Sequence, residues 1–143
     1  MRRWLYILGA LVIVVSSGAV IRSQTQAAAR TKFYTTKLQA YSNDLKPGLT
    51  RAEAEGYLQR KATGFRQMCC VLEPSAFADL VWIGQEKAPW FCSEEYVYVA
   101  LVFERSPQAT STSRPVSRFP IIDVDSTDVL KAVRLYKQPS GCL

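Results

Sequence analysis

The chain is 143 residues long, carries a formal net charge of +6 at pH 7 and contains no histidine. The absence of histidine excludes Ser-His-Asp triads and histidine-based zinc sites, and the glycines stand apart from one another, which excludes a glycine-rich phosphate loop. The basic residues are scattered rather than clustered, a pattern typical of a solvated surface and not of a nucleic-acid-binding protein. We therefore expect no catalytic activity, no cofactor and no nucleic-acid partner.

An uninterrupted run of apolar and small residues extends from Trp4 to Ile21, behind Arg2 and Arg3. A helix of this length spans about 27 Å, close to the hydrocarbon thickness of a bilayer. We predict that the run crosses the lipid bilayer as a transmembrane helix, within a membrane anchor at residues 1–24. A cleaved secretory signal peptide is the alternative, but such signals usually have a shorter apolar core, which favours the uncleaved anchor.

Residues 25–143 are polar enough to form one ordinary folded domain. A helix is predicted from Gln26 to Leu45, because apolar side chains recur along it at steps of four and three residues. Its apolar face consists of Tyr34, Leu38, Tyr41 and Leu45. We expect this face to pack on the sheet of the same domain. The run Lys46-Pro47-Gly48 ends the helix.

The next helix is predicted to begin at Thr50, whose hydroxyl can accept a hydrogen bond from a free amide in the first turn. Glu53, three residues on, can bond back to the backbone of Thr50 and complete a capping box. Gly64 is the expected end of the helix. The face expected in the core comprises Ala54, Tyr57, Leu58 and Ala62. The face expected in water comprises Arg51, Glu55, Gln59 and Lys61.

After Gly64 the apolar pattern changes to the two-residue period of β-strands. Strands are predicted over Gln67 to Glu73, Leu80 to Gln85, Glu95 to Arg105 and Val129 to Lys137. The third has two apolar faces, as expected of a central strand, with Val97, Val99, Leu101 and Phe103 on one and Tyr96, Tyr98, Ala100 and Val102 on the other. The predicted fold class is therefore α+β: an N-terminal transmembrane helix, then two helices and an antiparallel sheet of about four strands.

The cysteines are Cys69, Cys70, Cys92 and Cys142. An export or anchor segment places the domain in an oxidising compartment, so we predict that all of them form disulfides. Neighbouring residues of a strand point to opposite faces, so Cys69 and Cys70 are expected to bond to different partners, one to Cys92 and the other to Cys142. Reduced structural cysteines and a four-thiolate zinc site are the alternatives, and the lack of a C-x-x-C pair disfavours zinc.

Asp123, Asp125 and Asp128 are the residues most similar to a calcium-ligand set. Acidic residues in a turn before a strand are usually turn formers and solvated caps. We therefore predict no metal site.

Trp90 and Phe91 follow Pro89 in a predicted hairpin loop. Aromatic side chains exposed in loops are candidate anchors for protein partners, so this pair is the predicted partner contact. The alternative is that the pair folds back onto the core beside Cys92.

The stretch Lys46-Pro47-Gly48-Leu49-Thr50-Arg51-Ala52-Glu53-Ala54, followed by Leu58, resembles the P-G-[ML]-[ST]-x-x-[EQ]-[VA] opening of the BamE/SmpA-like small envelope proteins. The resemblance implies two helices followed by an antiparallel sheet. It also implies structural, non-catalytic roles for Gly48, Thr50 and Glu53. The chain departs from that family at its N-terminus, where BamE proteins carry a lipid-modified cysteine and this chain has a long apolar segment.

Together these patterns predict a single-pass protein of the cell membrane whose domain, residues 25–143, is extracytoplasmic. We expect it to be a protein-interaction or scaffold domain of the cell envelope, with another envelope protein as its partner. The alternative is a secreted or tethered inhibitor or ligand-binding module.

Overall fold

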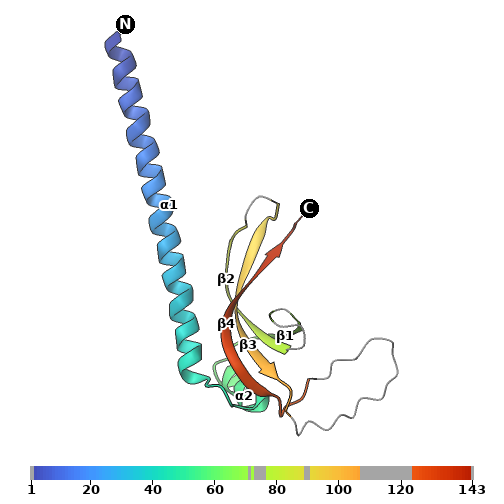
Figure 1. Cartoon of the computed structure of the whole chain (residues 1–143). Helices are drawn as coiled ribbons and strands as arrows, with labels where there is room; N and C mark the ends of the chain where they lie inside the picture. Colours follow the sequence, from blue (N-terminus) through green and yellow to red (C-terminus); the bar gives the residue numbers. More distant parts are fainter. Residues whose placement is uncertain (1, 71, 73–76, 89–90, 107–123, 143) are drawn as a thin grey trace. The chain divides into compact units, whose positions relative to one another are not determined.

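The computed structural model describes residues 2–70, 72, 77–88, 91–106 and 124–142 (Figure 1). In the N-terminal helix, side chains are described at position 22 and from position 24 onward. The described elements are two helices followed by four strands: α1 (Arg2–Asp44), α2 (Arg51–Arg60), β1 (Arg66–Cys69), β2 (Phe77–Lys87), β3 (Glu94–Glu104) and β4 (Val129–Ser140). The predicted α+β class with an antiparallel sheet is confirmed.

The chain divides into two compact units, Met1–Thr36 and Lys37–Leu143. The first unit is helical, and α1 is one uninterrupted helix where the sequence predicted an anchor and a separate helix. The reason is local, because neither glycine nor proline lies between Arg22 and Gln26 to break it. No helix is long and apolar enough to cross a membrane among the residues whose side chains are described. The segment predicted to lie in the bilayer, Trp4 to Ile21, is outside them, so the transmembrane helix stays a prediction.

In the second unit the strands form one antiparallel sheet in the order β1-β2-β3-β4 (Figure 1). β3 lies inside the sheet, paired along its length with β2 and β4, and its residues 97–103 are all buried. β1 is shorter than predicted, whereas β2 and β4 are longer. The predicted alternation along β3 is confirmed, since Val99, Leu101 and Phe103 belong to one apolar cluster and Tyr96, Tyr98 and Ala100 to the other.

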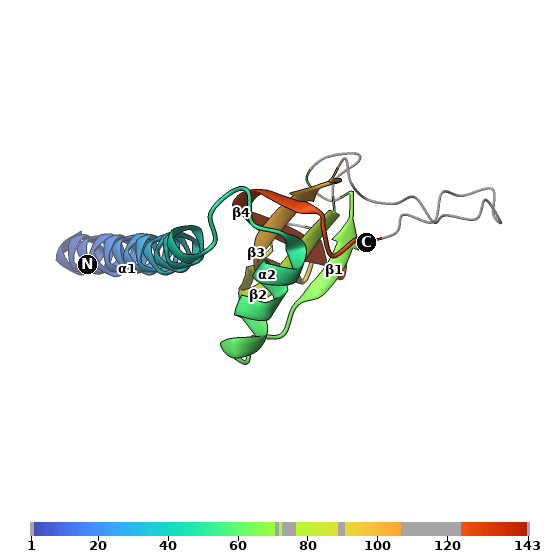
Figure 2. The same cartoon turned by 90° about the horizontal axis from the view of Figure 1, so that it is seen from below.

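One face of the sheet is covered by helix. Ala54 and Leu58 of α2 are fully buried against Val99, Leu101 and Phe103 of β3. Leu45, just after α1, joins the same cluster. Figure 2 shows α2 lying across the sheet. This cluster is the main core of the second unit.

The start of α2 is as the sequence predicted. The Thr50 hydroxyl accepts a hydrogen bond from the Glu53 amide at 3.3 Å, and the Thr50 amide donates to the Glu53 carboxylate at 2.8 Å. The end was predicted too late, because α2 stops at Arg60 rather than Gly64. Ala62 takes a left-handed conformation, with φ of 50°, and its amide bonds back to the Gln59 carbonyl at 2.9 Å. Ala62 is therefore exposed and not in the core.

Candidate interaction surface

The sheet face opposite α2 carries a row of aromatic side chains, which we call the aromatic face: Trp82 of β2, Tyr96 and Tyr98 of β3, and Tyr136 of β4. The register places Trp82 opposite Tyr98 and Tyr98 opposite Tyr136, so the three lie side by side across the sheet. The ring centroids of Tyr98 and Tyr136 are 6.3 Å apart. Tyr98 is buried, whereas 57% of Trp82 is exposed. An aromatic surface of this kind is suited to binding a protein partner.

Arg66, the first residue of β1, extends over this face. Its Nη2 donates to the Tyr98 hydroxyl at 3.4 Å and to Gln138 Oε1 of β4 at 3.2 Å. Its guanidinium carbon lies 5.8 Å from the centroid of the Tyr98 ring. A cavity of about 160 Å³ opens beside it, lined by Arg66, Tyr96, Tyr98, Gln138, Pro139 and Ser140. Three strands therefore contribute to one small polar pocket.

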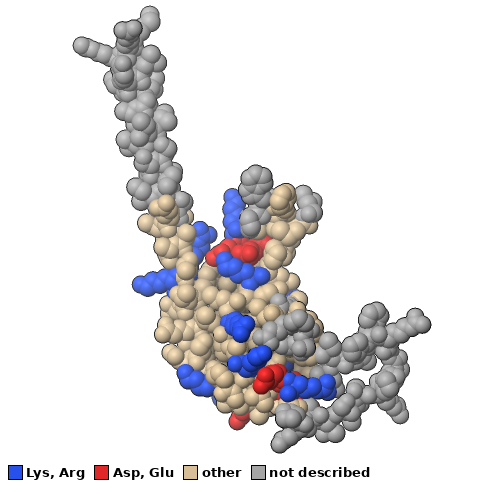
Figure 3. All heavy atoms as spheres, viewed as in Figure 1, with Lys and Arg blue, Asp and Glu red and all other residues tan. Residues whose placement is uncertain are grey.

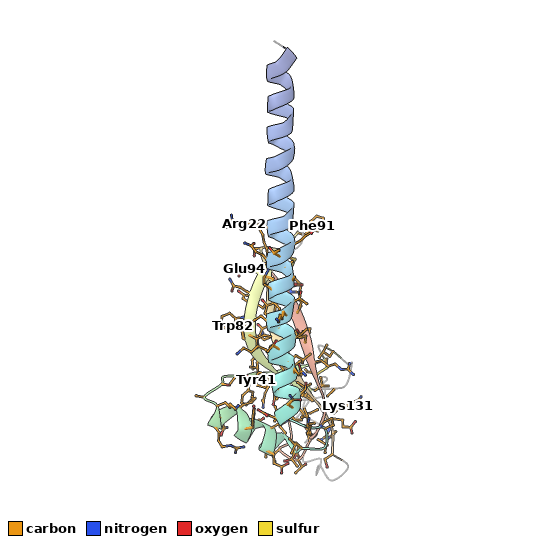
Figure 4. All side chains as sticks on the ribbon, turned by 90° about the vertical axis from the view of Figure 1, so that its left-hand side faces the viewer. Arg22, Tyr41, Trp82, Phe91, Glu94 and Lys131 are labelled. Carbon is orange, nitrogen blue, oxygen red and sulfur yellow. A yellow bond between two sulfur atoms is a disulfide. The ribbon has the colours of Figure 1, made fainter. Side chains whose placement is uncertain are left out.

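The predicted partner contact lies at the end of the β2–β3 hairpin. Phe91 is 70% exposed (Figure 4). For Phe91, the alternative that it folds back onto the core is therefore not what the structure shows. Trp90, the other predicted contact, lies outside the described residues.

Cys92, beside Phe91, forms a disulfide with Cys142, which corrects the predicted pairing. The register explains the bond, because the ladder of β3 and β4 ends at Glu94 opposite Ser140, and each cysteine lies two residues beyond. The antiparallel alignment thus brings the two chain segments together at the tip of the sheet. The disulfide links the β2–β3 connection to the chain just after β4.

Cys69 and Cys70 are bonded to each other, so the expectation that they point to opposite faces was wrong. β1 ends at Cys69, and Cys70 has a φ of 64° in the left-handed region. A residue in that conformation no longer follows the alternation of a strand. All four cysteines are therefore in disulfides, as predicted, but in a different pairing.

A charged cluster is buried beneath α2, and no sequence pattern predicted it. Arg51, expected in water, is 1% exposed, and its Nη1 lies 2.5 Å from Oδ1 of Asp79 of β2. Its Nε lies 3.5 Å from Oδ2 of Asp128, and its guanidinium carbon is 4.0 Å from the Phe103 ring centroid. A hydrophilic residue at the first turn of a helix looks solvated in sequence, but here that turn faces the sheet.

Burial raises the pKa of Asp79 to about 6, although the neighbouring Arg51 charge acts in the opposite direction. The carboxylates of Glu55 and Asp128 raise it further. One guanidinium therefore pairs with two carboxylates in a buried site. The cluster connects α2, β2 and the turn before β4.

The acidic turn before β4 has a structural role. Asp125 accepts hydrogen bonds from the Thr127 amide at 2.8 Å and from the Thr127 hydroxyl at 2.7 Å, and these lower its pKa. Asp128 binds Arg51, while Asp123 lies outside the described residues. Within the described part of the chain, no three His, Cys, Asp or Glu residues are grouped so as to hold a metal ion.

A second cavity, of about 260 Å³, lies between the last turns of α1 and the end of α2. Its wall includes Tyr57, whose hydroxyl donates to the Asp44 carboxylate. Lys61 Nζ is 3.5 Å from Asp44 Oδ2 and 5.1 Å from the Tyr57 ring centroid. The hydrogen bond from Tyr57 lowers the pKa of Asp44, and burial is the main cause of the raised pKa of Tyr57. The polar groups of this cavity thus bind one another.

On the face seen in Figure 3, acidic side chains lie among the basic side chains of the second unit. At the hairpin end of the sheet, Lys137 Nζ lies 2.7 Å from Glu86 and 3.3 Å from Glu95. The hydrogen bond to Glu86 is the main cause of the raised pKa of Lys137. Lys137 is therefore paired with two carboxylates at this end of the sheet.

Comparison with known proteins returned no similar protein: no family model, curated protein or solved structure matches the chain. The resemblance to the BamE/SmpA-like proteins rests on the residues around Gly48, Thr50 and Glu53 and stays a prediction. The geometry of the described residues is therefore the basis for any functional proposal.

Proposed function

We propose that the protein is a membrane-tethered interaction or scaffold domain of the cell envelope, without catalytic activity. The apolar run from Trp4 to Ile21 supports the tether. The pairing of the cysteines supports an oxidising, extracytoplasmic location for residues 25–143. The partner would be another envelope protein.

The exposure of Trp82 and Phe91 is the observation that carries this proposal. They are 57% and 70% exposed, and both belong to the β2–β3 hairpin and its connection (Figure 4). Large aromatic side chains left in water on a rigid support are typical of interaction sites, where aromatic anchors contribute most of the binding energy. The sheet and the Cys92–Cys142 bond supply that support.

Site-specific photo-crosslinking in native membranes tests the proposal. A photoreactive amino acid is placed at Phe91, at Trp82 and, as a control, at the exposed Gln59 of α2. We expect the first two positions to capture the same membrane-associated protein and Gln59 to capture none. Equal capture from all three positions, or none from any, would contradict the proposal.

The rival function is a secreted or tethered inhibitor or ligand-binding module. The cavity beside Arg66 favours it, because a small polar pocket can hold a ligand group. A soluble mature form that binds a soluble target would support this alternative over a scaffold.

A further inference from the structure

We propose that Arg66 and the cavity beside it form a carboxylate-binding cradle, which takes an Asp or Glu side chain of the partner protein. The inference rests on the proposed function, because it names the chemistry of the segment that the aromatic face would bind. Within the contact between the aromatic face and the partner, Arg66 of β1 would make the charged and specific interaction.

The position of the guanidinium is the first argument. Its hydrogen bonds to Tyr98 and Gln138, at 3.4 and 3.2 Å, both use Nη2. A guanidinium has five N–H donors in a planar fork that matches the two oxygens of a carboxylate. Arg66 is thus held in place across the sheet while its side chain is exposed to an incoming group.

The charge around Arg66 is the second argument. Three other basic side chains of the same unit pair with carboxylates: Arg51 with Asp79, Lys61 with Asp44 and Lys137 with Glu86. Arg66 contacts the neutral Tyr98 and Gln138, and among the described residues no carboxylate lies within ion-pair distance of it. Charge complementarity therefore favours an acidic ligand at this position.

The size and lining of the cavity fit a side chain. A carboxylate with one methylene occupies roughly the volume of two or three water molecules, about 60 to 90 Å³, and the cavity measures about 160 Å³. Trp82 and Tyr136 of the aromatic face can cover apolar neighbours of the acidic residue.

Glu94 decides from which side the ligand enters. It lies opposite Ser140 in the register, and its hydrogen bond with Tyr96 is the main cause of the raised pKa of Tyr96. Glu94 would repel a second carboxylate, which favours binding of the ligand on the Arg66 side.

The test is an NMR titration of the full-length, ¹⁵N-labelled protein in zwitterionic detergent. The probe is the α-amide of N-acetylglutamate, and the neutral control is the α-amide of N-acetylglutamine. We expect saturable shifts of the Arg66, Tyr98 and Gln138 signals with the acid and none with the neutral amide. Equal shifts with both compounds, or no saturation with the acid, would overturn the proposal.

Three variants locate the effect. Arg66→Gln is expected to weaken binding of the acid by about tenfold or more, the usual range for loss of a charge-assisted pair. Arg134→Gln is the matched control, since Arg134 lies on the same face opposite Ala100, and should change affinity by less than about twofold. Glu94→Gln should tighten binding by about two- to threefold, because it removes a like charge. Unchanged affinity in Arg66→Gln would contradict the cradle.

The two proposals fail separately. Capture of a partner from Phe91 together with no response to the acid would leave the interaction domain standing and remove the cradle. If the Arg66→Gln variant does not fold, the comparison of the acid with the neutral amide in the unaltered protein still tests the cradle.

Discussion

At the scale of single residues, the domain depends on how a few charged side chains are buried or exposed. Arg51 and Asp79 are almost fully enclosed, with Asp128 as a second carboxylate beside the guanidinium. Arg66 carries the same functional group as Arg51, but it lies over the Tyr98 ring and is exposed. Burial makes the first arginine structural, whereas exposure leaves the second able to bind a ligand.

The raised pKa of Asp79 predicts that the protein becomes less stable as the pH rises from 5 to 7.5. The folded state, with a pKa of about 6, binds a proton more tightly than the unfolded state, whose value is 3.8. This contribution to stability is complete below pH 3.8 and is lost as the pH rises through 6. Over the measured window the free energy of unfolding should fall by about 1 kcal/mol. Urea unfolding of the full-length protein at both pH values measures it.

Asp44, Glu53 and Asp125 do not contribute to this change in stability. Their pKa values are lowered, so these carboxyls titrate below pH 5. No histidine is present to titrate within it. Asp79→Asn is the control and should abolish the slope. A stability that rises from pH 5 to 7.5 in the unaltered protein would show that Asp79 is not held in this state.

At the scale of elements, the helices depend on their ends and the strands on their register. α2 begins with a capping box and ends where Ala62 turns left-handed. The β2–β3 and β3–β4 ladders assemble the aromatic face from residues that are far apart in sequence. The same β3–β4 register brings Cys92 to Cys142.

We predict that removing the Thr50 cap of α2 lowers the stability of the protein measurably. Thr50→Ala deletes the hydroxyl that accepts the Glu53 amide, and should lower the free energy of unfolding by about 1 kcal/mol. Thr63→Ala, in the segment after α2, is the matched control and should have a smaller effect. Denaturant midpoints of the full-length variants provide the measurement. If Thr50→Ala leaves the midpoint unchanged, another group must satisfy that amide.

At the scale of the whole molecule, the functional proposal combines a membrane segment with a folded domain. The tether depends on the composition of Trp4 to Ile21, and the contact surface on the sheet of the second unit. A tether confines the domain to a surface, which raises its effective concentration toward membrane partners. A weak contact at Phe91 or Trp82 would then suffice for association.

The tether predicts that the intact protein remains in the membrane fraction through alkaline and high-salt washes. Burial of the apolar run makes release unfavourable, whereas attachment by surface charge alone would be reversed by salt. Val14→Arg, which places a charge within the run, should increase release, and Arg22→Gln should not. Fractionation followed by mass spectrometry of the N-terminus measures both. A soluble form beginning between Ser17 and Ala29 would rule out the anchor.

The local features of the fold could be predicted from sequence because they depend on neighbouring residues. Thr50 and Glu53 are three positions apart and make the capping box without help from the rest of the chain. The alternation along β3 likewise follows from the geometry of an extended strand. Phe91 is exposed, as a partner contact requires, but its role as a contact stays a prediction.

Only the tertiary structure decided which polar residues are buried and which cysteines meet. The sequence places Arg51 in the first turn of a helix, but whether that turn faces water depends on Asp79 and Phe103 of the sheet. Cys92 meets Cys142 because the strand register aligns them, and register is a property of paired strands rather than of either one. Arg66 lies over Tyr98 for the same reason: its neighbours are brought together by long-range pairing, which no local pattern records.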